Sequence, residues 1–237
     1  EQSLSMRVSG GGLEPLDGRG AFKNFNIDMR QYNKLKMFLH AESLPNEIAL
    51  SDDQMVGFIR FGNDFTQNFY QIEIPLKVTI PSTTSGSNCG PLSAEAVWPA
   101  ENEIDLSLAL LTDMKINKPK DALDIYYPDD DINIPGDPDM RDGNDKLRLG
   151  IRGNPNFGMV RNLMLGVKSK EPHQDIKGEV WFDELRVADM DNSRGMAAVL
   201  NVDTNFADFA TISATGRKST IGFGGIEQGP NERNRED

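Results

Sequence analysis

The sequence predicts an all-β protein, a jelly-roll β-sandwich with one short helix. Short segments in which apolar and polar residues alternate recur along the chain, and clusters of Gly, Pro, Asn and Asp separate them. A single segment carries apolar residues at helical spacing. About seven short strands separated by turn signals are typical of two-layer sandwiches, and their order suits a jelly roll.

Three strands are predicted in the first third of the chain, over residues 34–41, 55–61 and 69–78, with a turn at 62–64 between the last two. In the first, every second residue is apolar and falls on one face. These residues are Leu35, Met37 and Leu39.

The third strand has the alternation of a half-buried strand. Its apolar positions are Tyr70, Ile72, Ile74 and Leu76, and its polar positions are Gln71, Glu73 and Lys77. Pro75 interrupts it, and because proline cannot donate to a ladder, an edge position or a bulge is expected there.

In the second half, a strand at 102–108 runs into the helix, which ends near Lys118. Strands resume at 146–152, 160–168 and 179–187. Residues 81–91 and the acidic stretch 127–145 are predicted as loops because of their Gly, Pro, Ser and Asp content.

Changes in composition and in the spacing of apolar residues divide the chain into three parts. Residues 1–19 form a lead-in that can be a strand, and residues 20–190 form the sandwich. Residues 191–237 form a C-terminal hairpin and a frayed tail leading towards the rest of a parent protein. The first hairpin segment, 196–203, is shorter than the about 9 to 11 residues of a transmembrane strand, and Asp203 and Asp208 lie at or near the ends of the segments 196–203 and 206–215, so no direct membrane insertion is expected.

Composition narrows the function classes. The chain has 237 residues, a formal net charge of −12 and a pI near 4.7, which argues against nucleic-acid binding. It opens EQSLSMRVSGGG, without an initiator Met or a signal-peptide pattern, and is expected to be a piece of a longer precursor. Cys89 is the only cysteine, so neither an intramolecular disulfide nor a cysteine metal cage can form.

Few residues suggest catalysis. The histidines His40 and His173 are interpreted as structural, and no nucleophile elbow, H-E-x-x-H helix or phosphate-binding loop is present. The best metal candidate is the acidic stretch, because hard cations prefer carboxylate oxygens. Its carboxylates are Asp129, Asp130, Asp131, Asp137, Asp139, Asp142 and Asp145. Arg141 stands where a calcium loop needs an oxygen ligand, so a solvated loop is favoured over a site. We predict no catalytic, cofactor-binding or metal-binding residue, and no enzyme.

Two further features are interpreted as structural. In 179–187, Trp181 shares a face with Leu185 and Val187, which predicts core packing for its ring, whereas Trp98 is the tryptophan expected at the surface. The run Arg152-Gly153-Asn154-Pro155-Asn156 is interpreted as a specific turn, with positive φ at the glycine and extended backbone before the proline.

Three pieces at the end of the chain occur in a specific order: EVWFDELR at 179–186, ADFA-x-IS-x-TG at 207–216 and GFGGIEQGPNER at 222–233. Together they resemble the SprA/Sov family, the outer-membrane translocon subunit of the type IX secretion and gliding motility system of the Bacteroidota. Weaker likeness at RQYNKLKMFLHAE (30–42), IRFGNDFTQNFYQIEIPLK (59–77) and IRGNPN (151–156) extends the resemblance over most of the chain.

The resemblance implies a non-catalytic structural or interaction domain of a translocon that exports proteins to the cell surface. Its partners would be the remainder of the same polypeptide, other secretion-system subunits and secreted cargo proteins. Its location would be the cell envelope, associated with the outer membrane.

The alternative is a carbohydrate-binding module at the cell surface, because the outline ending in a VWFDEL strand is similar to galactose-binding and carbohydrate-binding jelly rolls. That likeness concerns the fold alone. A sugar site of this kind requires exposed aromatic side chains, whereas a structural insert keeps them in the core.

Overall fold

The computed structural model describes residues 3–79, 93–120, 122–128, 147–191 and 196–220. The chain divides into two compact units, Glu1–Asp189 and Met190–Asp237.

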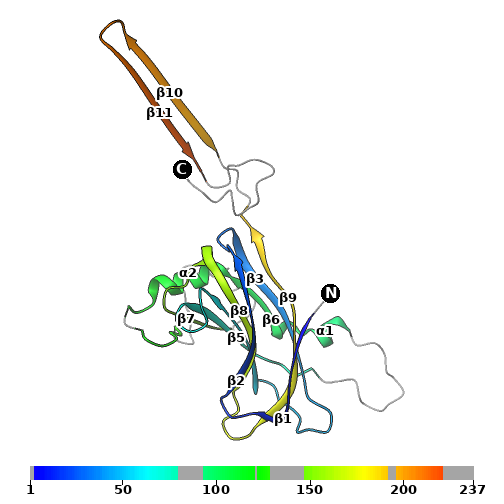
Figure 1. Ribbon diagram of the computed structural model, residues 1–237. Helices are drawn as coiled ribbons and strands as arrows, with labels where there is room; N and C mark the ends of the chain where they lie inside the picture. Colours follow the sequence, from blue (N-terminus) through cyan, green and yellow to red (C-terminus); the bar gives the residue numbers. More distant parts are fainter. Residues whose placement is uncertain (1–2, 80–92, 121, 129–146, 192–195, 221–237) are drawn as a thin grey trace. The chain divides into compact units, whose positions relative to one another are not determined.

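The first unit is a sandwich of two antiparallel sheets (Figure 1). The four-stranded sheet contains, in spatial order, β1 (Leu4–Leu13), β9 (Ile176–Met190), β3 (Tyr32–Glu42) and β6 (Glu103–Ser107). The five-stranded sheet contains β2 (Gly18–Ile27), β8 (Val160–Ser169), β4 (Met55–Gly62), β5 (Phe69–Pro75) and β7 (Arg148–Arg152).

The strand order is that of a jelly roll. Leaving aside the edge strand β7, the two sheets have the orders β1-β9-β3-β6 and β2-β8-β4-β5, so the chain crosses repeatedly from one sheet to the other. The predicted all-β jelly-roll sandwich is therefore confirmed.

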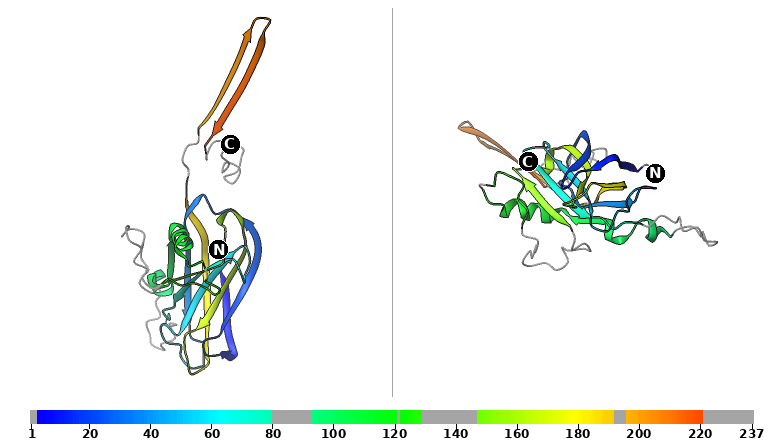
Figure 2. Two further views of the ribbon diagram at one scale, coloured as in Figure 1. Left: turned by 90° about the vertical axis from the view of Figure 1, so that its left-hand side faces the viewer. Right: turned by 90° about the horizontal axis from the view of Figure 1, so that it is seen from below.

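The predicted helix is α2 (Leu108–Asn117), which directly follows β6 and contacts β3 and β7. Its green coil lies on one side of the sandwich in Figure 2. It buries Leu108, Leu110, Leu111 and Met114. Within the described ranges, three further single turns were not predicted: α1 (Ala94–Val97) and the 3-10 turns Ala100–Asn102 and Phe157–Met159.

The core lies between the sheets. Leu35, Met37 and Leu39 of β3 are all buried, as their alternation predicted. Gly57 in β4 lies opposite, where a Cβ atom would come within 2.6 Å of the Leu39 side chain. The missing side chain at Gly57 therefore permits the close approach of the two sheets.

Strand β1 lies inside the segment 1–19, which the sequence analysis set apart as a lead-in. It is a full member of the four-stranded sheet, where Leu4 pairs with Phe182 and Leu13 with Ile176. Val8 and Leu13 are buried in the core. The sandwich thus starts before residue 20, because its edge strand comes from the first residues of the chain.

Strand β5 is buried on both faces, so the prediction of a half-buried strand was wrong. Gln71 and Glu73 are only 2% and 4% exposed. The segment after α2 covers them: Tyr126 forms a β-bridge to Ile151 of β7, and the Tyr127 ring lies over β7. Period-two alternation reports side-chain polarity, and polarity does not reveal that another segment covers the polar face.

Pro75 is the last residue of β5 and pairs with Val56. Pairing of β5 with β7 ends at Glu73. Among the described strands, Pro75 therefore has no neighbour on its β7 side, which confirms the predicted edge position.

Strand β9 corrects the prediction for Trp181. Val180 and Phe182 are buried in the core, whereas Trp181 points outward and is 36% exposed. Leu185 and Val187 nevertheless pack against the core. Glu184, between the two pairs, has a φ of 50°, and this left-handed residue shifts the alternation by one position.

The second unit is a hairpin of β10 (Ala197–Phe206) and β11 (Ala210–Ser219), ten residues each and paired throughout. The expectation that the first strand is shorter than a transmembrane strand was wrong, because β10 continues to Phe206, beyond the predicted segment 196–203. No helix among the described residues is long and apolar enough to cross a membrane.

Candidate functional site

The two histidines singled out from the sequence lie in different settings. His40 is buried on β3, whereas His173 is exposed before β9, where its backbone N–H donates to Glu171 at 3.1 Å. Cys89, Arg141 and the acidic stretch (Asp129, Asp130, Asp131, Asp137, Asp139, Asp142 and Asp145) lie outside the described residues. Within the described part, no three His, Cys, Asp or Glu side chains are grouped so that they could hold a metal ion.

Both tryptophans lie around His40 on the outer face of the four-stranded sheet. The His40 ring centre is 5.6 Å from the Trp181 ring and 5.8 Å from the Trp98 ring. Nδ1 of His40 lies 2.6 Å from the Val97 carbonyl oxygen, which can only accept, so this nitrogen carries the proton. The Trp181 indole N–H donates to Glu179 at 3.0 Å. The arrangement is an aromatic cluster with Trp181 at the surface.

A buried polar network lies on the outer face of the five-stranded sheet, centred on Glu73. Its Oε1 accepts from Lys168 Nζ at 2.9 Å, from the Tyr127 hydroxyl at 2.9 Å and from the Gln71 amide. Arg148 lies 3.7 Å from Oε2 and stacks 3.8 Å from the centre of the Tyr127 ring. The carboxylate is thus enclosed by donors.

Opposing effects set the pKa of Glu73. Burial raises the pKa of this carboxyl. The hydrogen bond and positive charge of Lys168, together with the hydrogen bonds from Gln71 and Tyr127, lower the pKa by a larger amount, so the net shift is downward. Burial and the neighbouring Glu73 raise the pKa of the Tyr127 hydroxyl. Glu73 therefore stays ionised and Tyr127 stays protonated, so the hydroxyl donates a stable hydrogen bond to the carboxylate and links the two segments. In the sequence, the only sign of this network was the pair of polar residues Gln71 and Glu73 within an otherwise apolar strand.

Two segments that resemble the SprA/Sov family meet in one loop cluster. The turn between β4 and β5 supplies Asn63 and Asn68, whose side-chain oxygens accept from the backbone N–H groups of Asn156 and Asn154, at 2.8 and 3.0 Å. Gly153 has a φ of 64°, and a Cβ there would lie 2.0 Å from the Gln67 carbonyl oxygen. The predicted specific turn at 152–156 is confirmed, because only glycine fits this approach.

Asp64 holds the β4–β5 turn in shape. Its carboxylate accepts from the backbone N–H groups of Thr66, Gln67 and Asn68, and from the Asn68 side chain. Burial raises the pKa of Asp64, but these donors lower it more, to about 2. The Asp64 carboxylate therefore stabilises the conformation of this turn.

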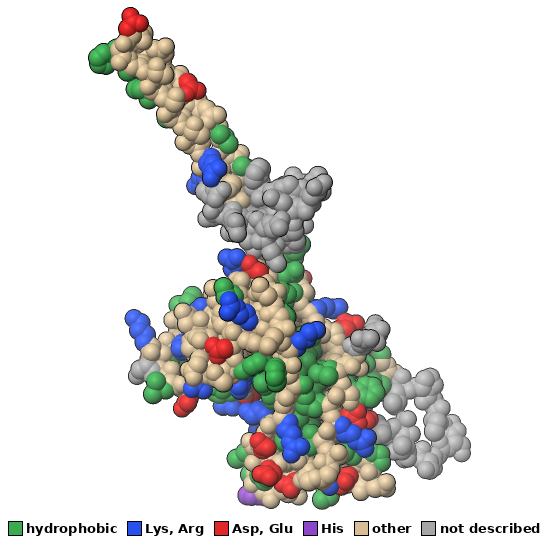
Figure 3. Space-filling model, in the orientation of Figure 1, with side chains coloured by type: hydrophobic (Ala, Val, Ile, Leu, Met, Phe, Trp, Pro, Cys, Tyr) green, Lys and Arg blue, Asp and Glu red, His purple; other side chains and the backbone are tan. Residues whose placement is uncertain are grey.

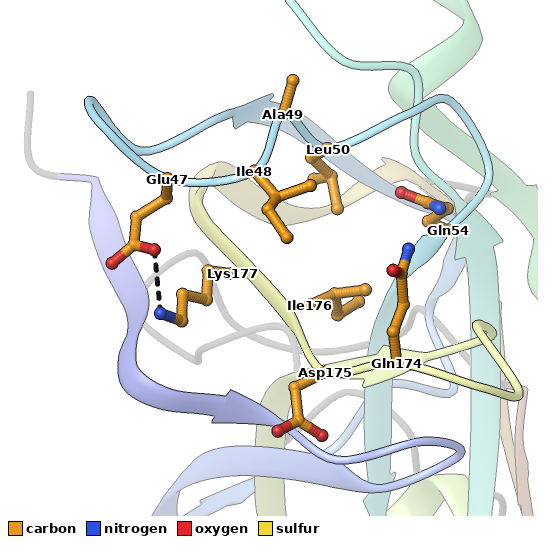
Figure 4. Close-up of a pocket in the computed structure, with 9 residues that line it drawn as sticks. All are labelled: Glu47, Ile48, Ala49, Leu50, Gln54, Gln174, Asp175, Ile176 and Lys177. Carbon is orange, nitrogen blue, oxygen red and sulfur yellow. Dashed lines mark hydrogen bonds and ion pairs between the residues drawn. The ribbon is translucent and has the colours of Figure 1, made fainter.

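A small cavity of about 50 Å³ lies between the loop after β3 and the start of β9 (Figure 4). Lys177 and Glu47 form an ion pair of 2.8 Å beside it, while Gln54 and Gln174 lie on the opposite side. Its volume is far below the 300 Å³ or more that small-molecule sites typically have.

A larger cavity of about 350 Å³ opens between the sheets. Apolar side chains from β2, β3, β4, β8 and β9 line it, with Arg186 as the charged residue among them. Hydrophobic side chains gather at the surface of the sandwich over the region between β2 and β9 (Figure 3). The β9 residues that line it, Leu185, Arg186 and Val187, follow Phe182, which pairs with Leu4 at the beginning of β1.

The hairpin has two unlike faces. Pairing places Leu200 opposite Gly216 and Val202 opposite Ala214, on the face that also carries Phe206. The other face carries Val199, Asn201, Asp203 and Asn205 of β10 and Thr211, Ser213, Thr215 and Arg217 of β11. Leu200 and Val202 are exposed, so the apolar face lacks a covering layer among the described residues.

Comparison with curated proteins gives no match to the chain. A family model of motility-related and secretion proteins, SprA_N, matches residues 1–237. The match includes the loop cluster, β9 and the hairpin, the same segments on which the sequence resemblance was based. The chain therefore belongs to the SprA/Sov family of motility-related and secretion proteins.

Proposed function

We propose that the chain is a non-catalytic structural and interaction domain of an outer-membrane protein-secretion translocon of the type IX and gliding motility system. The family match over the whole chain carries this proposal. The buried polar groups support a structural role. The carboxylates of Glu73 and Asp64 accept hydrogen bonds from neighbouring strands and from turn N–H groups, and these bonds hold the strands and the turn in place. Its partners would be the remainder of the parent polypeptide, other secretion subunits and cargo.

The exposed face of the hairpin supports the interaction role. An isolated two-stranded ribbon is marginally stable in water, and an exposed apolar face is stabilised when another surface covers it. The hairpin offers a face with Leu200, Val202 and Phe206, so a covering partner would bury these side chains.

Neighbouring residues offer a matched test. Leu200 and Val199 are 67% and 66% exposed but lie on opposite faces of β10. Leu200→Lys and Val199→Lys would each be introduced into the parent protein in its host, with secretion of a cargo protein and surface spreading measured. We expect loss of secretion for Leu200→Lys and little change for Val199→Lys, at equal amounts of parent protein in the outer membrane. Equal secretion by both variants would contradict the interaction role.

The aromatic cluster favours a second candidate, carbohydrate binding at the cell surface. Trp181 is exposed, and aromatic faces stack on sugar rings. Its tilted contact with His40 leaves a single partly open ring rather than a row of platforms, so we rank this function second. Titration of soluble bacterial polysaccharides into the chain and into Trp181→Ala tests it. Saturable binding that Trp181→Ala abolishes would support it.

A further inference from the structure

Two arginines lie around one aromatic ring on the outer face of the five-stranded sheet. Arg152 of β7 pairs directly with Phe69 of β5, and the Arg60 guanidinium of β4 lies 4.2 Å from the centre of the Phe69 ring. Burial lowers the pKa of Arg60, and the positive charge of Arg152 lowers it further, although Tyr127 and Glu73 act in the opposite direction. The two guanidinium groups are therefore neighbours of like charge.

These two arginines differ in their partners. Arg60 donates from Nε to the Gln71 side chain at 2.8 Å and from Nη1 to the Phe65 carbonyl oxygen at 3.0 Å. Nε of Arg152 is buried and has no hydrogen-bond partner in the described part of the chain. Because a buried donor without an acceptor costs free energy, this place lacks an acceptor that a ligand can supply.

The carboxylates of the adjoining strand and turn are already engaged. Glu73 accepts from Lys168 and Tyr127, and Asp64 accepts from the N–H groups of its own turn. Among the described residues, neither carboxylate forms an ion pair with Arg60 or Arg152. In a chain with a net charge of −12, this face carries four cations around the Glu73 carboxylate: Arg60, Arg148, Arg152 and Lys168.

An apolar patch adjoins the arginines. Phe22 of β2 is 65% exposed, and its ring meets the Phe65 ring edge-on, with the ring centres 5.2 Å apart. Strand pairing places Phe22, Met164 and Arg60 in one row across β2, β8 and β4, so their side chains lie on the same face. The Phe65 carbonyl oxygen accepts from Arg60 while the Phe65 ring contacts Phe22, so the charged and apolar groups are in direct contact.

We propose that Arg60 and Arg152 bind a carboxylate of an acidic peptide segment, and that an apolar side chain next to this carboxylate packs on Phe22 and Phe65. Guanidinium groups form paired hydrogen bonds with planar carboxylates, and arginine is enriched among the residues that dominate protein–protein interfaces. Both arginines are half-buried, so a single side chain reaches them, whereas the flat surface of an anionic membrane meets exposed groups first.

This inference deepens the interaction role proposed above by naming the class of partner, and it rests on that role. The two can fail separately. Peptide binding is measured on the chain alone, whereas the role in secretion is measured through Leu200 of the hairpin in the host.

The probe is the peptide Ser-Phe-Asp-Ser-Phe-Asp-Ser with capped ends, titrated into the whole chain and followed by isothermal titration calorimetry. The control peptide carries Asn in place of both Asp residues, which keeps the shape and removes the charge. We expect saturable binding of the acidic peptide and at least ten-fold weaker binding of the Asn peptide.

Arg152→Gln is the decisive variant. It removes the charge and the buried Nε without a partner, so it should weaken binding of the acidic peptide at least ten-fold and should leave the melting temperature unchanged or raise it. Arg217→Gln, at an exposed position of β11, should change neither quantity. If Arg152 only supported the fold, Arg152→Gln would instead lower the melting temperature and leave peptide affinity unchanged.

Four results would overturn the proposal. They are the absence of saturable binding, equal binding of the Asp and Asn peptides, parent-like affinity of Arg152→Gln, and binding of phosphatidylglycerol vesicles without binding of the acidic peptide.

Discussion

Phe182 and Leu185 pack against the same core although they lie three positions apart on one strand. Strict alternation would place them on opposite faces of the sheet. Glu184, with its left-handed backbone, absorbs the extra position. Because of this one residue, odd-numbered side chains such as Trp181 point outward before Glu184, whereas odd-numbered side chains such as Val187 point inward after it.

Glu184→Gly tests this bulge. Glycine adopts positive φ without the steric cost of a Cβ atom, so the variant should be neutral or more stable by up to about 1 kcal/mol. Deletion of Glu184 removes the extra position, so strict alternation then keeps Phe182, Leu185 and Val187 on one face and the variant should lose little stability. Urea unfolding of the three proteins measures both effects, and a large loss of stability in the deletion variant would show that Glu184 is not the extra position.

Trp181→Ala and Phe182→Ala should differ strongly. The Phe182 side chain is buried, and its truncation should cost about 3 to 5 kcal/mol through lost burial and the cavity left behind. Trp181 is partly exposed on the outer face, so its truncation should cost clearly less, about 1 kcal/mol. Chemical denaturation of both variants gives the comparison. A larger loss for Trp181→Ala would mean that its ring belongs to the core after all.

Glu73→Gln should destabilise the sandwich by about 1.5 to 3 kcal/mol at pH 7, because Lys168 and Arg148 lose a charged partner in a buried setting. The pKa of Glu73 is lowered in the folded state, so its contribution is complete above the unfolded value of about 4.3 and disappears as the pH falls below it. Glu14→Gln, at an exposed position, is the control. If the two variants melted alike at pH 7, the network would not stabilise the fold.

Asp64→Asn should cost about 1 to 2 kcal/mol at pH 7, since the amide accepts fewer of the turn's N–H groups than the carboxylate does. The folded pKa of about 2 lies below the unfolded value of about 3.9. Stability from Asp64 is therefore present above about pH 4 and lost as the pH falls towards 2. The difference between parent and variant, measured by thermal melting, should shrink over that interval. Asp124→Asn, an exposed change, should show no such trend.

The sequence predicted the parts of the fold that depend on local pattern. The buried set of β3 and the helix after β6 follow from spacing, and the turn at Gly153 follows from the one residue type that tolerates positive φ. The misplaced elements depend on distant contacts. Nothing near Glu73 shows that Tyr127 will cover it, 54 residues later in the chain.

The candidate surfaces also depend partly on local pattern and partly on distant contacts. The alternation of the hairpin was visible in the sequence, but its extent was not, because Ala, Thr and Gly at the strand ends are neutral signals. The cavity is lined by side chains from β2, β3, β4, β8 and β9, which are far apart in the sequence, so it required the fold. His40 and the two tryptophans come from separate strands and a turn, so their contact required the fold.

The pairing of β1 with β9 also has a consequence for how the chain acquires its structure. Ser5 and Glu179, which form a hydrogen bond across this ladder, are 174 positions apart. Such distant pairings slow folding, because the long intervening loop must close before they form. A chain delivered from its N-terminus keeps β1 without its neighbour until almost the entire sandwich sequence has emerged. The last strand of the sandwich to become available, β9, therefore completes the first, β1.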